Sequence, residues 1–228
     1  MHCCIVIPVY NSPYIREVLE DISKKGYTVI VVDDGSDQAF DVSDLNIELI
    51  SHKENQGKGE AILSGAKKAK ELGFDCFVTM DGDKQHLSSE IQKLVDAYEP
   101  ESIVIGNRDF SSENIPRSSK FGRKFSNFWV MIETFKKFRD TQSGFRIYPV
   151  SILDLKIKNR RFDFEIEVLV LHSYRGGKCI DVDVDCFYPS STKRVSHFDK
   201  KRDNIRLSLL HSRLCMQRFL LLRGFLWH

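Results

Sequence analysis

The 228-residue sequence lacks three features that would narrow its class at once: a strong charge of one sign, a long apolar run and closely spaced cysteine pairs. The formal net charge is only +2, so the chain as a whole does not have the charge expected of a nucleic-acid-binding protein. No stretch approaches the ~20 apolar residues that a membrane-spanning helix needs. We therefore expect no nucleic-acid partner, and any basic binding surface must be local.

The six cysteines are scattered and form no C-x-x-C pair. Most of them lie in apolar, strand-like surroundings, which is typical of reduced core cysteines rather than of a disulfide framework or a zinc site. The first strand-like run, residues 3–9, begins soon after Met1, so the sequence predicts no signal peptide. These patterns favour a cytoplasmic protein.

Apolar runs alternate with helical patterns along the first half of the chain. Runs rich in β-branched or other apolar residues predict buried strands at 3–9, 28–32, 47–51, 76–80 and 102–106. Apolar residues at helical spacing separate several of them. The alternation predicts an α/β fold with a mostly parallel, mixed sheet and helices on both faces. We expect a catalytic domain over residues 1–199 and a C-terminal helical tail over 200–228.

Polar and acidic residues gather where the predicted strands end. The endings are PVYN (8–11), DDGS (33–36), DGD (81–83) and GNRD (106–109). Ligands of such sheets sit at the carboxyl ends of the strands. An aspartate after a strand is often only part of a turn. Three acidic endings at one edge repel each other, so they indicate a site for a cation or a donor-rich ligand.

Six segments in this order, IPVYN, VVDDGS, NQGKG, MDGDKQH, GNRD and DTQSGFRIYP, resemble a family 2 glycosyltransferase with the GT-A fold. Within that family the chain is most similar to the polyprenyl-phosphate sugar transferases, the dolichyl-phosphate mannosyltransferase type. The resemblance covers roughly residues 3–190, and it is the order and spacing of the motifs that make it specific. It implies an inverting enzyme that moves a sugar from a UDP- or GDP-sugar to a polyprenyl phosphate or another lipid-linked acceptor. Such an enzyme would be peripheral on the inner face of the cytoplasmic membrane.

The resemblance also implies a metal site for Mg²⁺ or Mn²⁺. Asp81 and Asp83, one residue apart across Gly82, match its carboxylates, and Gln85 matches the position whose amide completes it. Carboxylates are the hard oxygen ligands that these cations prefer. The cation would act as a Lewis acid on the leaving diphosphate.

Further positions match the donor site of the family. Asp33 matches the residue that faces the nucleotide base and ribose, and Asp34 is its neighbour. The loop that lines the same pocket contains Pro8, Tyr10 and Asn11, while Gly35 allows the sharp turn after Asp34. Arg108 matches a basic residue near the donor phosphates.

Lys58 follows a glycine at the entrance of a predicted helix. The segment is not a dinucleotide fingerprint, because Ile62 stands where the third glycine belongs. Contact of Lys58 with the nucleotide and simple loop geometry both remain open interpretations.

The segment RDTQSGFR (139–146) supplies the predicted acceptor side. Asp140 is the candidate catalytic group: a hydroxyl acceptor would need it as a base, whereas an ionised lipid phosphate needs only positioning. A structural ion pair with Arg139 or Arg146 is the alternative. Arg146 is also a catalytic candidate, with Gln142 and Ser143 shaping the site. Of two glutamates in FDFEIEVL (162–169), Glu165 is favoured over Glu167 as a group that faces the site.

The last quarter of the chain is basic and apolar. Arg194 and His197, with Lys193, fall where a loop closes over the donor diphosphate in the family, but no mannose-specific signature follows. The tail 203–228 combines Leu and Phe with Arg and Trp, which fits either a membrane interface or packing on the domain or on a second subunit. The aromatic helix around residues 121–132 fits either a core or a lipid-facing surface.

Three other functions are alternatives to this one. The first is transfer to a soluble or glycan hydroxyl, and the second is a non-catalytic nucleotide-sugar-binding protein. The third is a signalling receiver domain, which the sequence disfavours because the acidic pair follows the second strand and not the first.

Overall fold

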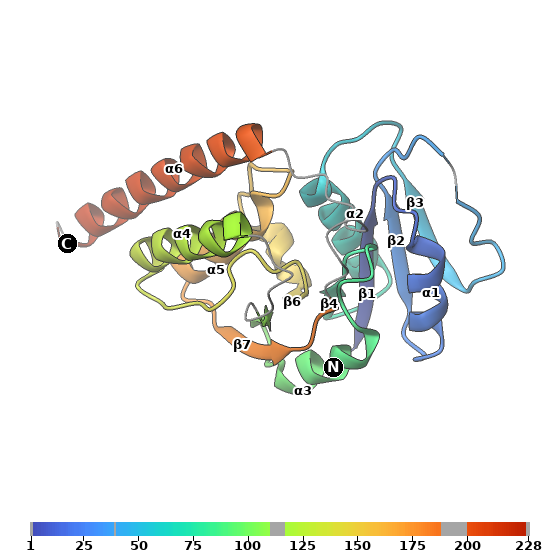
Figure 1. Ribbon diagram of the computed structural model, residues 1–228. Helices are drawn as coiled ribbons and strands as arrows, with labels where there is room; N and C mark the ends of the chain where they lie inside the picture. Colours follow the sequence, from blue (N-terminus) through green and yellow to red (C-terminus); the bar gives the residue numbers. More distant parts are fainter. Residues whose placement is uncertain (1, 39, 110–116, 188–199, 227–228) are drawn as a thin grey trace.

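The computed structural model describes residues 2–38, 40–109, 117–187 and 200–226, with side chains at all of these positions except 117–118, 200–204 and 221–226. The predicted α/β fold is confirmed, because a seven-stranded sheet lies between helices (Figure 1). The strands are β1 (Cys3–Val9), β2 (Val29–Asp33), β3 (Ile47–Ser51), β4 (Cys76–Thr79), β5 (Ile103–Arg108), β6 (Arg146–Pro149) and β7 (Cys179–Val184). The α-helices are α1 (Ile15–Ser23), α2 (Lys58–Glu71), α3 (Ile91–Ala97), α4 (Arg117–Thr134), α5 (Phe164–Tyr174) and α6 (Lys200–Leu226). Two short 3₁₀ turns are η1 (Ser88–Glu90) and η2 (Val150–Asp154).

The strand order is β3-β2-β1-β4-β6-β5-β7, and the sheet is mixed as predicted. Only β6 among these strands runs antiparallel to its neighbours β4 and β5. Arg146, the first residue of β6, therefore pairs with Thr79 and Ile105 near the carboxyl ends of β4 and β5. The reversed strand thus brings the segment before it, residues 140–145, to the edge where the parallel strands end.

The core lies on both faces of the sheet, as the continuous apolar strands predict. In β1, Ile5 and Ile7 join a cluster with residues of α1 and α3, while Cys4 and Val6 join a cluster with residues of α2 and α5. All six cysteines are free, which confirms the absence of the disulfide framework that the sequence disfavours. The two clusters hold the strands in register, so the loops at the strand ends have fixed anchors.

Helix α6 packs against α4 and α5 (Figure 1). Leu207, Leu210 and Leu214 are buried on this contact. Polar contacts support it: Tyr174 Oη donates to the Leu214 carbonyl at 2.9 Å, and Arg213 contacts Glu167 at 2.5 Å. Packing on the domain is therefore confirmed for this stripe of the tail.

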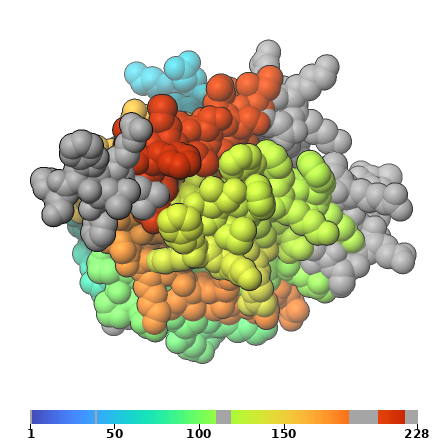
Figure 2. Space-filling model, turned by 90° about the vertical axis from the view of Figure 1, so that its left-hand side faces the viewer, coloured from blue at the N-terminus to red at the C-terminus, as the bar shows by residue number. Residues whose placement is uncertain are grey.

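A second apolar set on α4 and α6 stays exposed. Figure 2 shows the two helices side by side on one face of the molecule. The exposed members are Phe121, Phe125, Phe128, Ile132 and Phe135 around α4, and Ile205, Leu209, Met216, Phe219 and Leu220 on α6. The core interpretation of the aromatic helix is therefore wrong for its three phenylalanines. Within the described ranges, none of the helices has the length and apolarity required to span a bilayer.

Candidate active site

The loops after β1 and β2 are joined by hydrogen bonds at the carboxyl edge of the sheet. The Asn11 backbone N–H donates to Ser36 Oγ at 2.9 Å, and the Asn11 side chain exchanges hydrogen bonds of 2.8 and 2.9 Å with Asp37. Asp33 Oδ1 accepts the Ser36 N–H at 3.0 Å. Gly35 has φ +74°, a conformation that confirms the predicted sharp turn. Of the predicted donor residues, Pro8 and Asp33 thus lie at the ends of β1 and β2, and Tyr10 and Asn11 lie on the loop after β1, which is bound to the loop after β2.

Asp34 is buried behind this edge and holds the loop that leads into α2. Its two oxygens accept hydrogen bonds from the His52 ring at 2.7 Å, the Gln56 N–H at 3.0 Å and the Gly57 N–H at 2.7 Å. These contacts fix the residue just before Lys58. Asp34 therefore positions this loop, and its contact with the donor stays a prediction.

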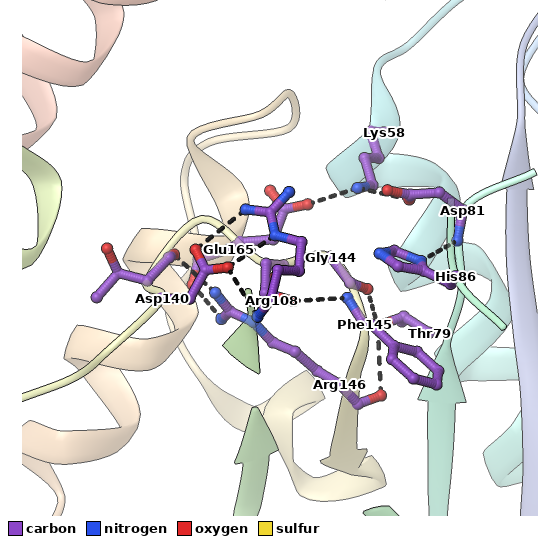
Figure 3. Close-up of polar contacts among 12 residues, drawn as sticks. Lys58, Thr79, Asp81, His86, Arg108, Asp140, Gly144, Phe145, Arg146 and Glu165 are labelled. Carbon is purple, nitrogen blue, oxygen red and sulfur yellow. Dashed lines mark hydrogen bonds and ion pairs between the residues drawn. The ribbon is translucent and has the colours of Figure 1, made fainter. Parts of the chain in front are cut away.

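Lys58 lies between two carboxylates that come from distant parts of the chain (Figure 3). Its Nζ is 2.7 Å from Asp81 Oδ1 and 2.8 Å from Glu165 Oε1. Burial favours the neutral form of Lys58, but the two carboxylates outweigh it and raise the pKa of the ammonium. Burial also disfavours ionised Asp81, yet Lys58 and then His86 outweigh it and lower the pKa of Asp81 to about 2. The site is therefore charged at neutral pH.

Gly144 provides the space for this ion pair. A Cβ at position 144 would lie 2.5 Å from Lys58 Nζ and 3.0 Å from Asp81 Oδ2. The Gly144 carbonyl accepts a hydrogen bond of 2.8 Å from Thr79 Oγ1, which fixes the loop against the end of β4. Any side chain here would force the ammonium or the carboxylate to move.

Asp83 and Gln85 form the second part of the acidic turn. Asp83 Oδ1 accepts the Gln85 N–H at 3.0 Å, and Asp83 Oδ2 accepts Gln85 Nε2 at 2.7 Å. Ser12 Oγ donates to the Gly82 carbonyl at 2.5 Å, which ties this turn to the loop after β1. The turn is thus anchored on both sides of Gly82.

The acidic turn has the donor set for a divalent cation that is shared with a substrate. Among the described residues, no group of three or more His, Cys, Asp and Glu side chains could hold a metal by itself. Asp81 and Asp83 supply two carboxylates. Mg²⁺ is usually held by one or two carboxylates together with substrate phosphates and water, so two carboxylates fit a shared ion.

His86 is a member of the site that the sequence did not identify. The ring is buried, stacks on Phe145 with centroids 4.9 Å apart, and accepts the Asp81 N–H at its Nδ1 (3.2 Å). Because a backbone N–H only donates, Nδ1 is unprotonated and the neutral ring carries its proton on Nε2. Burial is the main cause that lowers the pKa of His86 to about 4. Its position after DGDKQ was the available signal, but a lone buried histidine has no distinctive spacing.

Asp140 lies in a buried ion pair with Arg108 (Figure 3). Arg108 Nε donates to Asp140 Oδ2 at 2.7 Å, and Nη2 donates to Oδ1 at 3.0 Å. The Asp140 side chain is fully buried. The structural ion pair that was the alternative for Asp140 is present, but its partner is Arg108, since Arg139 contacts Asp183 and Arg146 contacts backbone carbonyls. The catalytic role of Asp140 stays a prediction. The structure thus joins two residues that were assigned to opposite sides of the site.

Arg146 lies behind the site and holds its backbone. The guanidinium is fully buried and donates to the carbonyls of Ser143, Glu165 and Thr141, each at 2.7 Å. These contacts connect the 141–145 loop to the first turn of α5. Arg146 therefore supports this backbone through its guanidinium, and its catalytic role stays a prediction.

An open, basic cavity of about 740 Å³ adjoins the Asp140–Arg108 pair. Several of its cations come from α4. Its lining comprises Lys93, Asn107, Arg108, Asp109, Lys120, Arg123, Lys124, Arg139, Asp183, Val184 and Asp185. The cavity therefore offers positive charge to an anionic ligand. The predicted loop residues Lys193, Arg194 and His197 lie outside the described residues.

The sequence matches a known family over most of its length. The model of glycosyl transferase family 2 matches residues 4–155. The UDP-N-acetylglucosamine–dolichyl-phosphate N-acetylglucosaminyltransferase of Methanococcus voltae is 28% identical over 196 residues, which cover 73% of this chain and 78% of that protein. The undecaprenyl-phosphate mannosyltransferase of Micrococcus luteus is 25% identical over 202 residues, which cover 81% and 83% of the two chains.

The fold is similar to that of a solved glycosyltransferase. Glucosyl-3-phosphoglycerate synthase from Mycobacterium tuberculosis, in complex with UDP, matches with a TM-score of 0.70 and 17% identity over 94% of this chain and 80% of that one. Another structure of that enzyme, with Mn²⁺, UDP and phosphoglyceric acid, matches with a TM-score of 0.66 and 16% identity over 95% and 78% of the chains. At this identity the likeness establishes the fold alone.

Proposed function

The chain belongs to glycosyl transferase family 2 and is a glycosyltransferase, and from this premise we propose the reaction that it catalyses. The donor is a UDP- or GDP-sugar, the acceptor is a polyprenyl phosphate, and transfer inverts the anomeric centre at a membrane surface. The names of the relatives from Methanococcus voltae and Micrococcus luteus support the acceptor class.

The observation that carries the proposal is the composition of α4. This helix contributes Lys120, Arg123 and Lys124 to the basic cavity, and it exposes Phe121 and Phe128 to solvent. A polyprenyl phosphate has an anionic head and an apolar chain. The cavity fits the head, and the exposed aromatic surface beside it fits the chain.

The carboxyl edge of the sheet is proposed as the donor site. Asp81, Asp83 and Gln85 would hold Mg²⁺ or Mn²⁺, which supplies Lewis-acid neutralisation of the leaving diphosphate when it is bound. The Mn²⁺ and UDP in the structure of the Mycobacterium tuberculosis enzyme support this part of the proposal. The loops with Tyr10, Asn11 and Asp33 would bind the nucleoside.

Asp140 is proposed to act through Arg108. A phosphate monoester is already ionised near neutral pH, so it needs no general base. The Asp140 carboxylate holds the guanidinium with two hydrogen bonds at the wall of the cavity. Arg108 would then present a fixed positive charge between the acceptor phosphate and the donor.

The acceptor proposal is tested by transfer to a polyprenyl phosphate and to a polyprenol of the same length. We expect transfer only to the phosphate. The double variant Lys120→Gln/Lys124→Gln should raise KM for the phosphate about tenfold with little change in kcat, since each exposed ion pair contributes up to about 1 kcal/mol. Lys67→Gln/Lys70→Gln, on exposed positions of α2, is the matched control. Transfer to the polyprenol or to a soluble sugar instead would contradict the proposal.

The exposed apolar face of α4 and α6 is proposed to rest on the membrane. Phe121→Ser/Phe128→Ser should weaken binding to anionic lipid vesicles by at least about tenfold, because each phenylalanine contributes on the order of 1–2 kcal/mol on burial. Vesicle co-sedimentation measures the effect. Leu49→Ser/Leu72→Ser removes two exposed leucines elsewhere and should change little.

Deletion of residues 218–228 should weaken vesicle binding as well. That variant is less specific, because Arg218 also lies over the rings of Phe135 and Tyr174. Equal vesicle binding by the wild type and the double phenylalanine variant would contradict the membrane proposal. Contact with a second copy of the chain would then be the alternative for this surface.

The Lys58–Asp81 contact is expected to need glycine at position 144. Gly144→Ala places a methyl group 2.5 Å from the ammonium position and should lower transfer by on the order of 10–100-fold. Gly122→Ala is the control, since its nearest neighbour, Gln142 Oε1, is 3.9 Å away. Initial rates measure the loss of transfer, and thermal unfolding measures any loss of stability. A wild-type rate for Gly144→Ala would show that the space beside the ammonium and the Asp81 carboxylate is irrelevant to transfer.

A further inference from the structure

The ammonium of Lys58 occupies a position where cationic charge is required. Asp81, at the end of β4, and Glu165, in the first turn of α5, both contact Nζ. Two carboxylates brought this close without a cation would repel each other and would have to take up a proton. A single positive charge between them leaves a net charge of −1, and Asp83 adds a further negative charge across Gly82.

The two carboxylates differ in their access to solvent. The Asp81 side chain is 29% exposed, the Glu165 side chain is 5% exposed, and Lys58 is 16% exposed. A cation from solution therefore meets Asp81 first. Glu165 lies behind it and, among the described residues, forms its ion pair with the ammonium.

Glu165 has a second carboxylate oxygen that can accept a hydrogen bond from the ammonium. Its Oε2 is buried and has no hydrogen-bond partner among the described residues, while Oε1 contacts Nζ at 2.8 Å. An ammonium has three protons to donate, so Lys58 can satisfy this second oxygen if it gives up Asp81. The space that Gly144 leaves beside Nζ gives the ammonium room for that adjustment.

We infer that the Lys58 ammonium occupies the cation position on Asp81 until a divalent ion binds there. The divalent ion then displaces the ammonium from Asp81, while the contact between the ammonium and Glu165 remains. The inference rests on the metal site of the proposed function. Lys58 contacts Asp81 Oδ1, and a divalent cation on either oxygen of that carboxylate would lie close to the ammonium. The two positive charges repel, so metal binding at Asp81 competes with Lys58. The displaced ammonium stays at the edge of the donor site, where a diphosphate would bind. Lys58 is then a positioning residue that keeps the metal-free site assembled.

The test is Mn²⁺ affinity without nucleotide, measured by electron paramagnetic resonance of free Mn²⁺. Lys58→Met keeps the aliphatic stem and removes the competitor, and we expect it to bind Mn²⁺ at least about tenfold more tightly than the wild type. Lys84→Met is the matched control. Lys84 is one residue from Asp83, but its ammonium contacts Glu17 and lies over the ring of Tyr14. We expect less than about a twofold change there.

The melting temperature, measured with and without Mn²⁺, shows whether Lys58→Met has lost stability. Without metal, Lys58→Met leaves two carboxylates uncompensated, so its melting temperature should fall and should rise more on Mn²⁺ addition than that of the wild type. Mn²⁺ binding to the wild type with equal or weaker binding to Lys58→Met would overturn the exchange alone. An equal gain for Lys84→Met would also overturn it, because the effect would then be one of general charge. Binding to neither the wild type nor Lys58→Met would overturn the exchange together with the proposed metal site.

Discussion

Replacing Asp83 by asparagine is expected to lower sugar transfer by about 10³-fold or more and to leave the fold intact. Asp83 lies on a turn, is only half-buried, and accepts two hydrogen bonds from Gln85 within that turn. An asparagine can keep one of them but has no negative charge for a cation. Loss of the Lewis acid removes several kcal/mol of stabilisation from the leaving diphosphate.

Asp96→Asn is a close control for this prediction. Asp96 Oδ1 also accepts a side-chain amide, that of Gln92, at 2.7 Å, but on the exposed surface of α3. Its transfer rate should equal that of the wild type. Steady-state rates at saturating Mn²⁺, with circular dichroism as the test of folding, measure both variants. Transfer by Asp83→Asn at the wild-type rate would remove Asp83 from the metal site.

The second large effect is expected at Asp140. Asp140→Asn removes a fully buried carboxylate charge from a pair with two hydrogen bonds, in which the Arg108 side chain is 15% exposed. Loss of one partner of a buried ion pair costs about 3–5 kcal/mol, so the melting temperature should fall clearly. Transfer should fall by roughly 10²-fold, because Arg108 no longer has a fixed position.

The pH dependence of kcat/KM separates the two roles of Asp140. A positioning role predicts that Asp140→Asn lowers the whole profile without changing its shape. Loss of the acidic limb of the profile would instead identify Asp140 as a general base.

Asp183→Asn is the matched control for the fall in stability. It removes the charge of a 2.8 Å contact with Arg139, but the Asp183 side chain is 76% exposed and the Arg139 side chain is 56% exposed. The free energy of unfolding should therefore change by less than about 1 kcal/mol.

The sequence predicted the parts of this protein that depend on local patterns. Strands 3–9 and 47–51 were predicted with the bounds of β1 and β3. The other three predicted strands differ from β2, β4 and β5 by one or two residues at an end. The polar strand ends did mark one edge of the sheet, because parallel strands place their carboxyl ends together. The divalent metal and the roles of the individual residues remain predictions.

The contacts between distant segments were not predictable in the same way. Lys58, Asp81 and Glu165 are separated by 23 and 84 positions along the chain, and only the packing of α2 and α5 on the sheet brings them together. Asp140 was correctly placed near the site, but its partner Arg108 was assigned to the donor because pairing across β5 and the 140–145 loop has no local signal. The exposed phenylalanines of α4 have the spacing of a core helix, and only the position of α6 shows which side is covered.

The reversed strand β6 has a consequence for how substrate preference can change. Because β6 starts at the catalytic edge, the loop 140–145 and the helix α4 before it reach the site as one continuous insertion after β5. The proposed donor groups from Tyr10 to Gln85 precede this insertion, and the proposed acceptor groups, except Arg108, lie within it. On this proposal, separable stretches of the chain would bind the two substrates. Exchange of residues 117–145 between relatives would alter the acceptor while the nucleotide-sugar half of the enzyme is inherited unchanged.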